Sequence, residues 1–421
     1  MKYTKYLENF ILLSFTLIPI LLITGPFLPD LFLSLSSISF LILCFKYQLW
    51  KKLYDYNVVK FFFLFCILIL LRSLFSENIR LSLESSLFYF RFGLFSLGIF
   101  YLVPKQKKFI KYTFYVLIII YLCLFLDGFY QFFAGKNIIG FVYNDPHNFR
   151  ITSFFGEDEV LGSYIVRLFP FTLYLYFFLE FNKKDRNYVI ISLLFCLSFL
   201  TIILSGERTA LALFAITILI FLFSSKFLKK IFFYLLIAMI CFSSVITIFD
   251  KRIKHRVYDQ TFNQIFNEKE DRIVIFSKIY EGHYKIALNM FFEKPLIGHG
   301  TKTFRYYCSK PENFVSVNAC STHPHNILMQ FLSETGVLGT AFYVLVLYFL
   351  SILLLKNLYL SYYKRKKFLN DKLLCLTVFY MVNLFPFLPS GNFFNNWLSI
   401  IYFLPAGMYM YEIYQFKSKN L

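Results

Sequence analysis

Apolar stretches long enough to cross a bilayer recur along almost the whole chain. A helix needs about 20 apolar residues to span the hydrocarbon core of a membrane, and the sequence offers roughly twelve such stretches. They are expected near residues 8–25, 27–45, 58–75, 84–103, 112–132, 160–181, 188–205, 208–225, 230–249, 337–355, 372–389 and 396–414. Because 58% of the residues are hydrophobic, the chain is predicted to be an all-α, polytopic integral membrane protein.

Lysine and arginine clusters fall in every second short loop between these stretches. The clusters are Lys46/Lys51/Lys52, Lys105/Lys107/Lys108/Lys111, Lys183/Lys184/Arg186, Lys226/Lys229/Lys230, Lys364/Arg365/Lys366/Lys367 and Lys417/Lys419. Positive residues of short loops stay on the cytoplasmic side, so this pattern predicts an even number of spans with both termini cytoplasmic. Topology therefore explains much of the net charge of +19, and no nucleic-acid-binding module is recognised.

The chain is predicted to be a single membrane domain, residues 1–421, without an internal repeat or linker. Met1 to Gly25 has no small-residue cleavage site and is expected to be an uncleaved first helix. Two loops on the outer side are long: 134–159, and 250–325 between the ninth and tenth expected spans. Within the second loop, residues 280–292 have apolar residues at helical spacing, which predicts an amphipathic helix.

The passage from Gly298 to Gly339 is polar and lies between membrane-grade apolar sequences. Its glycines and Pro311 favour an irregular backbone. Cys308 and Cys320 share this loop and could form a disulfide in an oxidising compartment, or remain two free thiols. His323 and His325 then lead into an apolar helical run, Ile327 to Leu332, expected to end near Gly336.

These residues also carry a family resemblance. His325-Asn326, followed by nine residues and Gly336, and preceded by the turn Pro295 to Gly300, resembles the O-antigen ligase and polymerase family. The resemblance implies a membrane glycosyltransferase that uses sugars carried on undecaprenyl diphosphate. It places the essential histidine at His325, with Asn326, Glu334 and Gly336 in supporting positions.

Glycosyl transfer needs a base to take the proton of the attacking hydroxyl, and histidine suits this near neutral pH. His325 is therefore the candidate catalytic base, against the alternatives of a surface residue or a helix cap. His323 is expected to be its neighbour. A metal pair of His323 and His325 lacks a third ligand beside it, so neither a metal nor a cofactor is expected.

Two arginines are candidates for holding the diphosphate. Arg208 lies in a tight outer turn, Ser205 to Ala210, similar to a turn in which the family carries an arginine; alternatively it snorkels or pairs with Glu207. Arg150 precedes the acidic residues 157–159, and either completes a diphosphate clamp or pairs with them. Arg91 and Arg167 interrupt apolar spans and are further candidates, whereas Arg72 is placed to snorkel.

One position departs from the family pattern. Members often have a glycine-arginine pair ahead of a tryptophan in the amphipathic helix, where this chain has Ile279-Tyr280 ahead of His283-Tyr284. Arg272 aligns with that arginine only through an insertion. A third anion-binding arginine is therefore an open question.

The resemblance implies an inverting, metal-independent O-antigen ligase of the bacterial inner membrane, multi-pass, with its active site facing the periplasm. Its expected partners are an undecaprenyl-diphosphate-linked glycan, a lipid A core or second lipid-linked glycan as acceptor, and membrane lipids. A polysaccharide polymerase and a protein O-glycosylating relative use the same chemistry. A polysaccharide or lipid transporter is the alternative from another class, although the repeated halves typical of many transporters are not seen.

Overall fold

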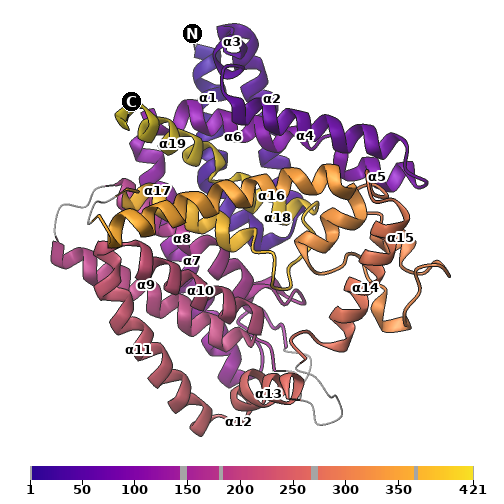
Figure 1. The fold of residues 1–421 in the computed structure, drawn as a ribbon. Coiled ribbons are helices and arrows are strands. Elements are labelled where there is room, and N and C mark those ends of the chain that lie inside the picture. The colour runs from indigo at the N-terminus through magenta and orange to yellow at the C-terminus, as the bar shows by residue number, and fades with distance from the viewer. Residues whose placement is uncertain (1, 143–148, 180–183, 267–273, 365–367, 421) are drawn as a thin grey trace.

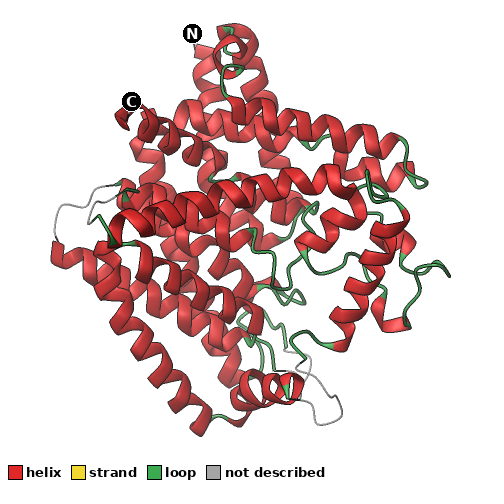
Figure 2. Ribbon diagram, in the orientation of Figure 1, coloured by secondary structure: helices red, strands yellow, loops and turns green. Residues whose placement is uncertain are grey.

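The computed structural model describes residues 2–142, 149–179, 184–266, 274–364 and 368–420. These residues are mostly helical and contain no β-strand, as Figure 2 shows. An isolated bridge joins Lys136 and Val142. The predicted all-α class is confirmed.

The helices follow one another with short connections until residue 134 and again between 161 and 266. They are α1 (Lys2–Leu21), α2 (Phe27–Tyr47), α3 (Trp50–Leu53), α4 (Asn57–Leu74), α5 (Ile79–Ser86), α6 (Phe90–Leu102), α7 (Lys107–Ala134), α8 (Leu161–Phe178), α9 (Lys184–Ser205), α10 (Arg208–Ser224), α11 (Lys226–Phe249), α12 (Lys251–Ile253), α13 (Gln260–Ile265), α14 (Lys278–Glu293), α15 (Phe304–Tyr307), α16 (Ile327–Tyr362), α17 (Asp371–Asn383), α18 (Asn396–Phe403) and α19 (Ala406–Asn420).

Nine helical segments in the described parts of the chain are long and apolar enough to cross a membrane. They are Tyr3–Thr24, Phe27–Tyr47, Asn57–Leu74, Ile79–Lys105, Lys107–Ala134, Leu161–Phe178, Tyr188–Ser205, Lys226–Phe249 and Ile327–Tyr362. Length and composition thus indicate a polytopic membrane protein.

The other three expected spans correspond to shorter helices. The stretch 208–225 is α10, with 17 residues, and 372–389 is α17, with 13 residues. The stretch 396–414 is divided into α18 and α19 around Pro405, which cannot donate a helical hydrogen bond. Twelve spans, and a large loop between the ninth and tenth, therefore stay predictions.

Helix α8 lies at the centre of the helical packing. It contacts α7, α9, α10 and α17, and nearly all of its residues are buried. Such all-round apolar burial is typical of a helix surrounded by others.

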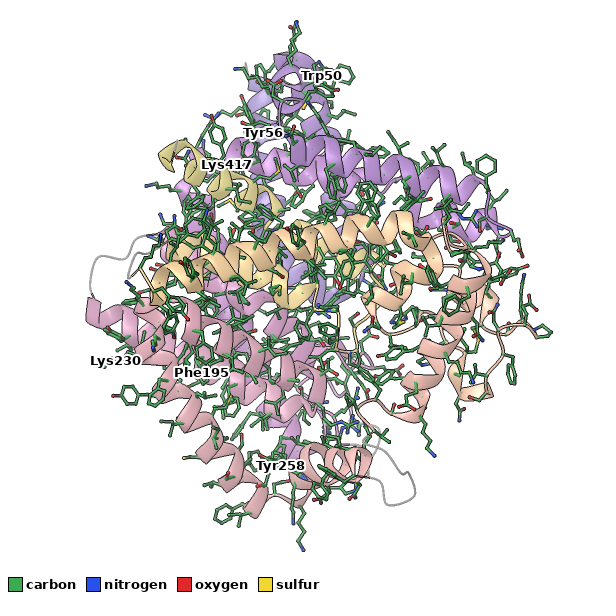
Figure 3. The ribbon with its side chains drawn as sticks, viewed as in Figure 1. Trp50, Tyr56, Phe195, Lys230, Tyr258 and Lys417 are labelled. Atoms are coloured by element: carbon green, nitrogen blue, oxygen red, sulfur yellow. A yellow bond between two sulfur atoms is a disulfide. The ribbon has the colours of Figure 1, made fainter. Side chains whose placement is uncertain are left out.

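Different parts of the chain lie at the two ends of the molecule. Figure 1 shows both termini at one end, α12 and α13 at the opposite end, and α14 and α15 along one side. Figure 3 likewise places Trp50, Tyr56 and Lys417 with the termini and Tyr258 at the opposite end.

A separate apolar cluster holds the α14–α15 region together: Ile286, Ala287, Met290, Phe304, Tyr307, Cys308 and Ala319. The expected amphipathic helix is confirmed, because α14 buries Ile286, Ala287 and Met290.

Candidate functional site

A break at Gly336 divides α16 into two helices. Gly336 has φ 60° and ψ −164°, outside the helical region, so backbone groups on both sides of it lose their helical partners. The turn 295–300 replaces them. Val337 and Leu338 donate to the carbonyls of Pro295 and Leu296, and His299 and Gly300 donate to those of Ser333 and Glu334, at 2.8–3.1 Å. The expected helix end near Gly336 is confirmed.

Glycine is required at this crossing because two backbones touch. A Cβ on Gly336 would lie 2.6 Å from the backbone nitrogen of Gly298, and one on Gly298 would lie 2.4 Å from the carbonyl carbon of Glu334. Both glycines also have positive φ. Arg72 is buried instead of snorkelling, and its Nε donates to the Gly298 carbonyl at 2.7 Å. The family-like turn and Gly336 thus form one packed unit.

Glu334 holds the start of the next loop. Its fully buried carboxylate accepts the backbone N–H groups of Lys302 and Phe304 at 2.9 and 3.2 Å. Gln330 donates to the same carboxylate at 3.0 Å. No bond links Glu334 to His325, so its role here is to fix the loop that follows the turn.

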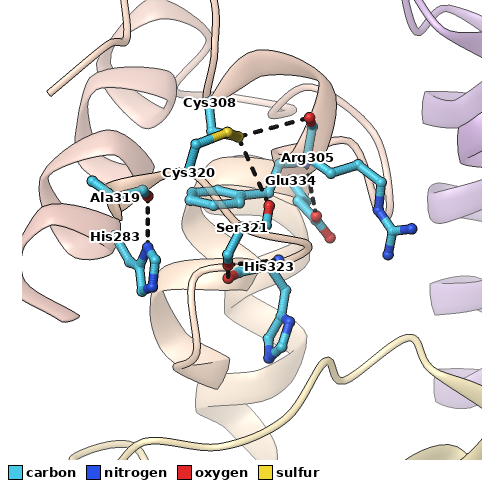
Figure 4. The surroundings of a disulfide bond; sticks show 9 residues. His283, Arg305, Cys308, Ala319, Cys320, Ser321, His323 and Glu334 are labelled. Atoms are coloured by element: carbon cyan, nitrogen blue, oxygen red, sulfur yellow. Dashed lines mark hydrogen bonds between the residues drawn. A yellow bond between two sulfur atoms is a disulfide. The ribbon is translucent and has the colours of Figure 1, made fainter. Parts of the chain in front are cut away.

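A disulfide joins Cys308 and Cys320, whose Cα atoms are 5.1 Å apart. It closes a loop with a sequence separation of 12, for which chain-entropy arguments give roughly 3 kcal/mol of stabilisation. Figure 4 shows His283 and His323 near this bridge, with Arg305 pointing away from it. The loop before the histidines is therefore covalently constrained.

His325 stands immediately before the cap of α16, in an unusual backbone conformation. Its φ is +52°, which is uncommon outside glycine and is often associated with functional sites. Two hydrogen bonds hold His325 and the following Asn326 in place. Ser390 N–H donates to the His325 carbonyl at 2.9 Å, and Asn326 donates to the Pro386 carbonyl at 2.8 Å. Asn326 also caps the helix by accepting from Met329 N–H at 3.1 Å.

Aromatic rings surround the His325 imidazole. Its centroid lies 4.0 Å from His323, 5.1 Å from His283 and 5.6 Å from Tyr280. Among the described residues, neither His325 ring nitrogen has a hydrogen-bond partner. These four residues are called the histidine side of the site. Sequence reasoning paired His323 with His325 but did not assign roles to His283 or Tyr280; their place in the amphipathic helix, three residues apart, was the only signal.

The histidines are held neutral. Burial, followed by the nearby His283, lowers the pKa of His325 to about 4. Burial and then His325 lower the pKa of His323 to about 3, and burial also lowers the pKa of His283. A neutral imidazole has a free lone pair, so His325 can accept a proton at neutral pH.

Three arginines from distant segments form the second part of the site. Arg150 and Arg208 both act on the buried Arg256, whose pKa falls to about 10 through burial and these two charges. Arg256 belongs to a π-helical turn, Lys254–Asp259, and bonds to the Gly206 carbonyl and the Gln260 side chain. These three arginines are called the arginine side. No role was predicted for Arg256 from the sequence.

Arg208 is half-buried and donates to Thr261 Oγ1 at 3.3 Å. Within the described part of the chain it has no carboxylate partner. The alternative partner Glu207 instead accepts from Gly162 N–H and from Ser163 at the start of α8, at 2.6–3.1 Å. Arg150, in contrast, forms an ion pair with Glu159, as its alternative predicted.

Tyr280 connects the two sides. Its ring contacts His325, and its hydroxyl lies within electrostatic range of both Arg208 and Arg256. It occupies the position where the resemblance led us to look for an arginine. Arg272, the other candidate for that role, lies outside the described residues.

The remaining arginines of the spans are used in packing. Arg91 forms an ion pair with Asp30 at 2.8 Å. Arg167 is buried, and donates to the Asn383 side chain at 3.2 Å. Both side chains are therefore bonded to polar groups of neighbouring helices.

Comparison with known families gives a match in the middle of the chain. Residues 193–344 match the model of a family described as O-Antigen ligase. The match contains Arg208, Arg256 and all three histidines of the site, and it ends before the C-terminal helices; Arg150 lies before it. No curated protein matches the sequence.

Proposed function

Because residues 193–344 match the family model described as O-Antigen ligase, we propose that this protein transfers a glycan from undecaprenyl diphosphate to a sugar hydroxyl. The acceptor is the lipid A core, and the reaction takes place on the periplasmic side of the bacterial inner membrane. The observation that carries the proposal is a neutral His325, without a hydrogen-bond partner among the described residues, whose neighbour Tyr280 also acts on Arg208 and Arg256.

In the reaction, the acceptor hydroxyl attacks the anomeric carbon from the face opposite the diphosphate. The new bond joins the acceptor oxygen to that carbon, and the bond from the carbon to the phosphate oxygen breaks. The diphosphate leaves with the electron pair, and the hydroxyl proton goes to a ring nitrogen of His325. One such displacement inverts the anomeric configuration.

The arginine side holds the leaving group. A diphosphate carries its charge on several oxygens, which match the planar donors of guanidinium groups. Arg208 is the main contact because no described carboxylate competes for it. Arg150 contributes when the diphosphate displaces Glu159, which is only partly buried and is therefore a weak competitor. Arg256 adds positive charge behind them, which favours the developing negative charge.

A polymerase would use the same donor, with a second lipid-linked glycan as acceptor. The two functions share the base and the arginines and differ only in the acceptor. The expected result of deleting the gene is a lipid A core without attached polysaccharide, together with accumulation of the lipid-linked chain. Deleting the gene of a polymerase would instead leave lipid A core that carries a single polysaccharide repeat unit.

The direct test is reconstitution with purified donor and acceptor in EDTA. We expect transfer with inverted configuration by the wild type, and a loss of about 10²–10⁴ for His325→Ala. Wild-type protein that is inactive with both acceptors would remove the proposal. Activity that disappears with EDTA and returns with a divalent ion would replace the histidine base with a metal mechanism.

A further inference from the structure

His283 belongs to α14 yet lies against the proposed base. It is almost fully buried, and its Nδ1 lies 2.6 Å from the Ala319 carbonyl oxygen (Figure 4). A carbonyl only accepts, so Nδ1 carries the proton and Nε2 has the lone pair when the ring is neutral. The ring is therefore fixed both in position and in tautomer.

The face of His283 is stacked on His325. The two ring planes differ by 26°, with their centroids 5.1 Å apart. The nitrogens of His325 have no hydrogen-bond partner among the described residues, so hydrogen bonds within this part of the chain do not set its orientation. Ring contacts do. His283 and His323 each have a ring nitrogen on a backbone carbonyl, but His283 has the shorter bond and is the ring that stacks on His325.

The carbonyl that fixes His283 belongs to the disulfide-closed loop. Ala319 precedes Cys320, and both Ala319 and Cys308 are packed in the apolar cluster under α14. The bridge thus restrains the acceptor atom of the His283 bond. A continuous path runs from the disulfide through Ala319 and His283 to His325.

We propose that His283 is a positioning residue for His325, and that the Cys308–Cys320 bridge acts on the reaction through it. The proposal rests on the function proposed above. A base must be held in a narrow range of orientations relative to the attacking hydroxyl, and small displacements are costly in rate. His283 supplies a flat, buried surface that holds the His325 ring.

The charges around His325 agree with this role. The titratable groups facing it are Tyr280 and His283 from α14 and His323 from its own loop; Arg305 from α15 acts on His323. None of these is an acid that would stabilise a protonated His325. Removing the His283 ring would admit water to the buried face, and the pKa of His325 would move up from about 4 toward its ordinary value.

Three substitutions separate the ring from its hydrogen bond. His283→Ala removes both, His283→Phe keeps a flat ring without the donor, and His283→Asn keeps a donor near the Nδ1 position without the ring. We expect kcat to fall about 10–100-fold for the alanine and asparagine variants, with the donor KM nearly unchanged, and most of kcat to be retained with phenylalanine. His255→Ala is the matched control, because His255 is exposed on the outer loop.

The opposite ranking would overturn the proposal. Wild-type rates for His283→Asn with a loss for His283→Phe would mean that His283 only anchors the loop. The bridge is tested by replacing both cysteines with serine in wild-type and His283→Ala backgrounds. We expect a loss in the first background and little further loss in the second; fully additive losses would contradict the path through His283.

A readout without activity keeps this test independent of the proposed function. Diethylpyrocarbonate modifies neutral imidazole, and mass spectrometry follows its reaction at His325 as a function of pH. We expect the midpoint for His325 to rise in His283→Ala and to stay unchanged in His255→Ala. An unchanged midpoint in His283→Ala would overturn the inference, even if the wild type transfers glycan. Absence of wild-type transfer alongside a raised midpoint would instead overturn only the function.

Discussion

The histidine side and the arginine side of the site are built in opposite ways. The two histidine rings beside His325 are neutral and bonded to backbone carbonyls close to a disulfide, and His283 stacks on His325. The arginines are charged, Arg150 and Arg208 add to burial in lowering the pKa of Arg256, and Arg208 lacks a described carboxylate. Stacked neutral groups give a base a fixed geometry, whereas concentrated positive charge needs an anion. This difference supports the proposal that the histidine side transfers the proton and the arginine side binds the substrate.

Removing the proposed base from the histidine side is expected to cause the largest loss of transfer. His325→Ala should lower transfer by about 10²–10⁴, the usual contribution of a positioned acid–base group. His323→Ala should cost much less, because His323 uses its nitrogens on Thr322 and the Ser390 carbonyl. Rates are compared at equal abundance in the membrane. Equal losses for the two variants would leave the base unassigned.

Weakening the arginine side should have the next largest effect. Loss of a charge-assisted hydrogen bond costs about 1.5–3 kcal/mol, so Arg208→Ala should lower kcat/KM about 10–100-fold. Arg208→Lys should retain more activity, because it keeps the charge but loses the planar donors. Arg80→Ala, on an exposed arginine of α5, is the control. A wild-type kcat/KM in Arg208→Ala would exclude this residue from the site.

The packed unit beneath the histidine side can be broken without touching the chemistry. Gly336→Ala introduces both a strained φ and a clash with the 295–300 turn, and should reduce the amount of folded protein. Gly135→Ala is the matched control, since Gly135 has φ +76° with nothing within 4 Å of an added Cβ. That variant should lose only about 1 kcal/mol from backbone strain. Thermal unfolding in detergent measures both; similar losses would show that the crossing at Gly336 tolerates a side chain.

The pH dependence of transfer tests the histidine side and is expected to show the smallest effect of these predictions. The active form of His325 is neutral, and its lowered pKa, caused mainly by burial, keeps it neutral down to about pH 4. Transfer should therefore fall as pH decreases through about 4, whereas an ordinary histidine would lose activity near 6.5. A pH–rate profile of kcat on the acidic side measures this. A fall in kcat near pH 6.5 would mean that His325 is exposed to water when substrate is bound.

Local patterns predicted the histidine side better than the arginine side. The break at Gly336, the helix that begins after Asn326 and the amphipathic face of α14 all follow from residues close together in sequence. The stacking of His283 on His325 depends on how α14 packs against α16, which periodicity does not specify. Glycine at 298 and 336 indicated an irregular backbone, but not that the two glycines touch.

The arginine side depends on contacts between residues far apart. Arg150, Arg208 and Arg256 come from three separate segments, so their proximity could not be inferred from spacing. Arg256 also lies among other basic residues, such as Lys254, and nothing in the sequence distinguishes it from them. Helices were also shorter than expected where proline or a short apolar run intervened, as at α18 and α19.

Donor binding measured separately from transfer tests the division of roles most directly. Purified wild type, His325→Ala and Arg208→Ala are titrated with the same undecaprenyl-diphosphate-linked glycan, and transfer is then measured with each. We predict that His325→Ala binds donor with the wild-type Kd but transfers almost none of it, and that Arg208→Ala binds donor about 10-fold or more weakly. Donor binding lost in His325→Ala and retained in Arg208→Ala would contradict the account.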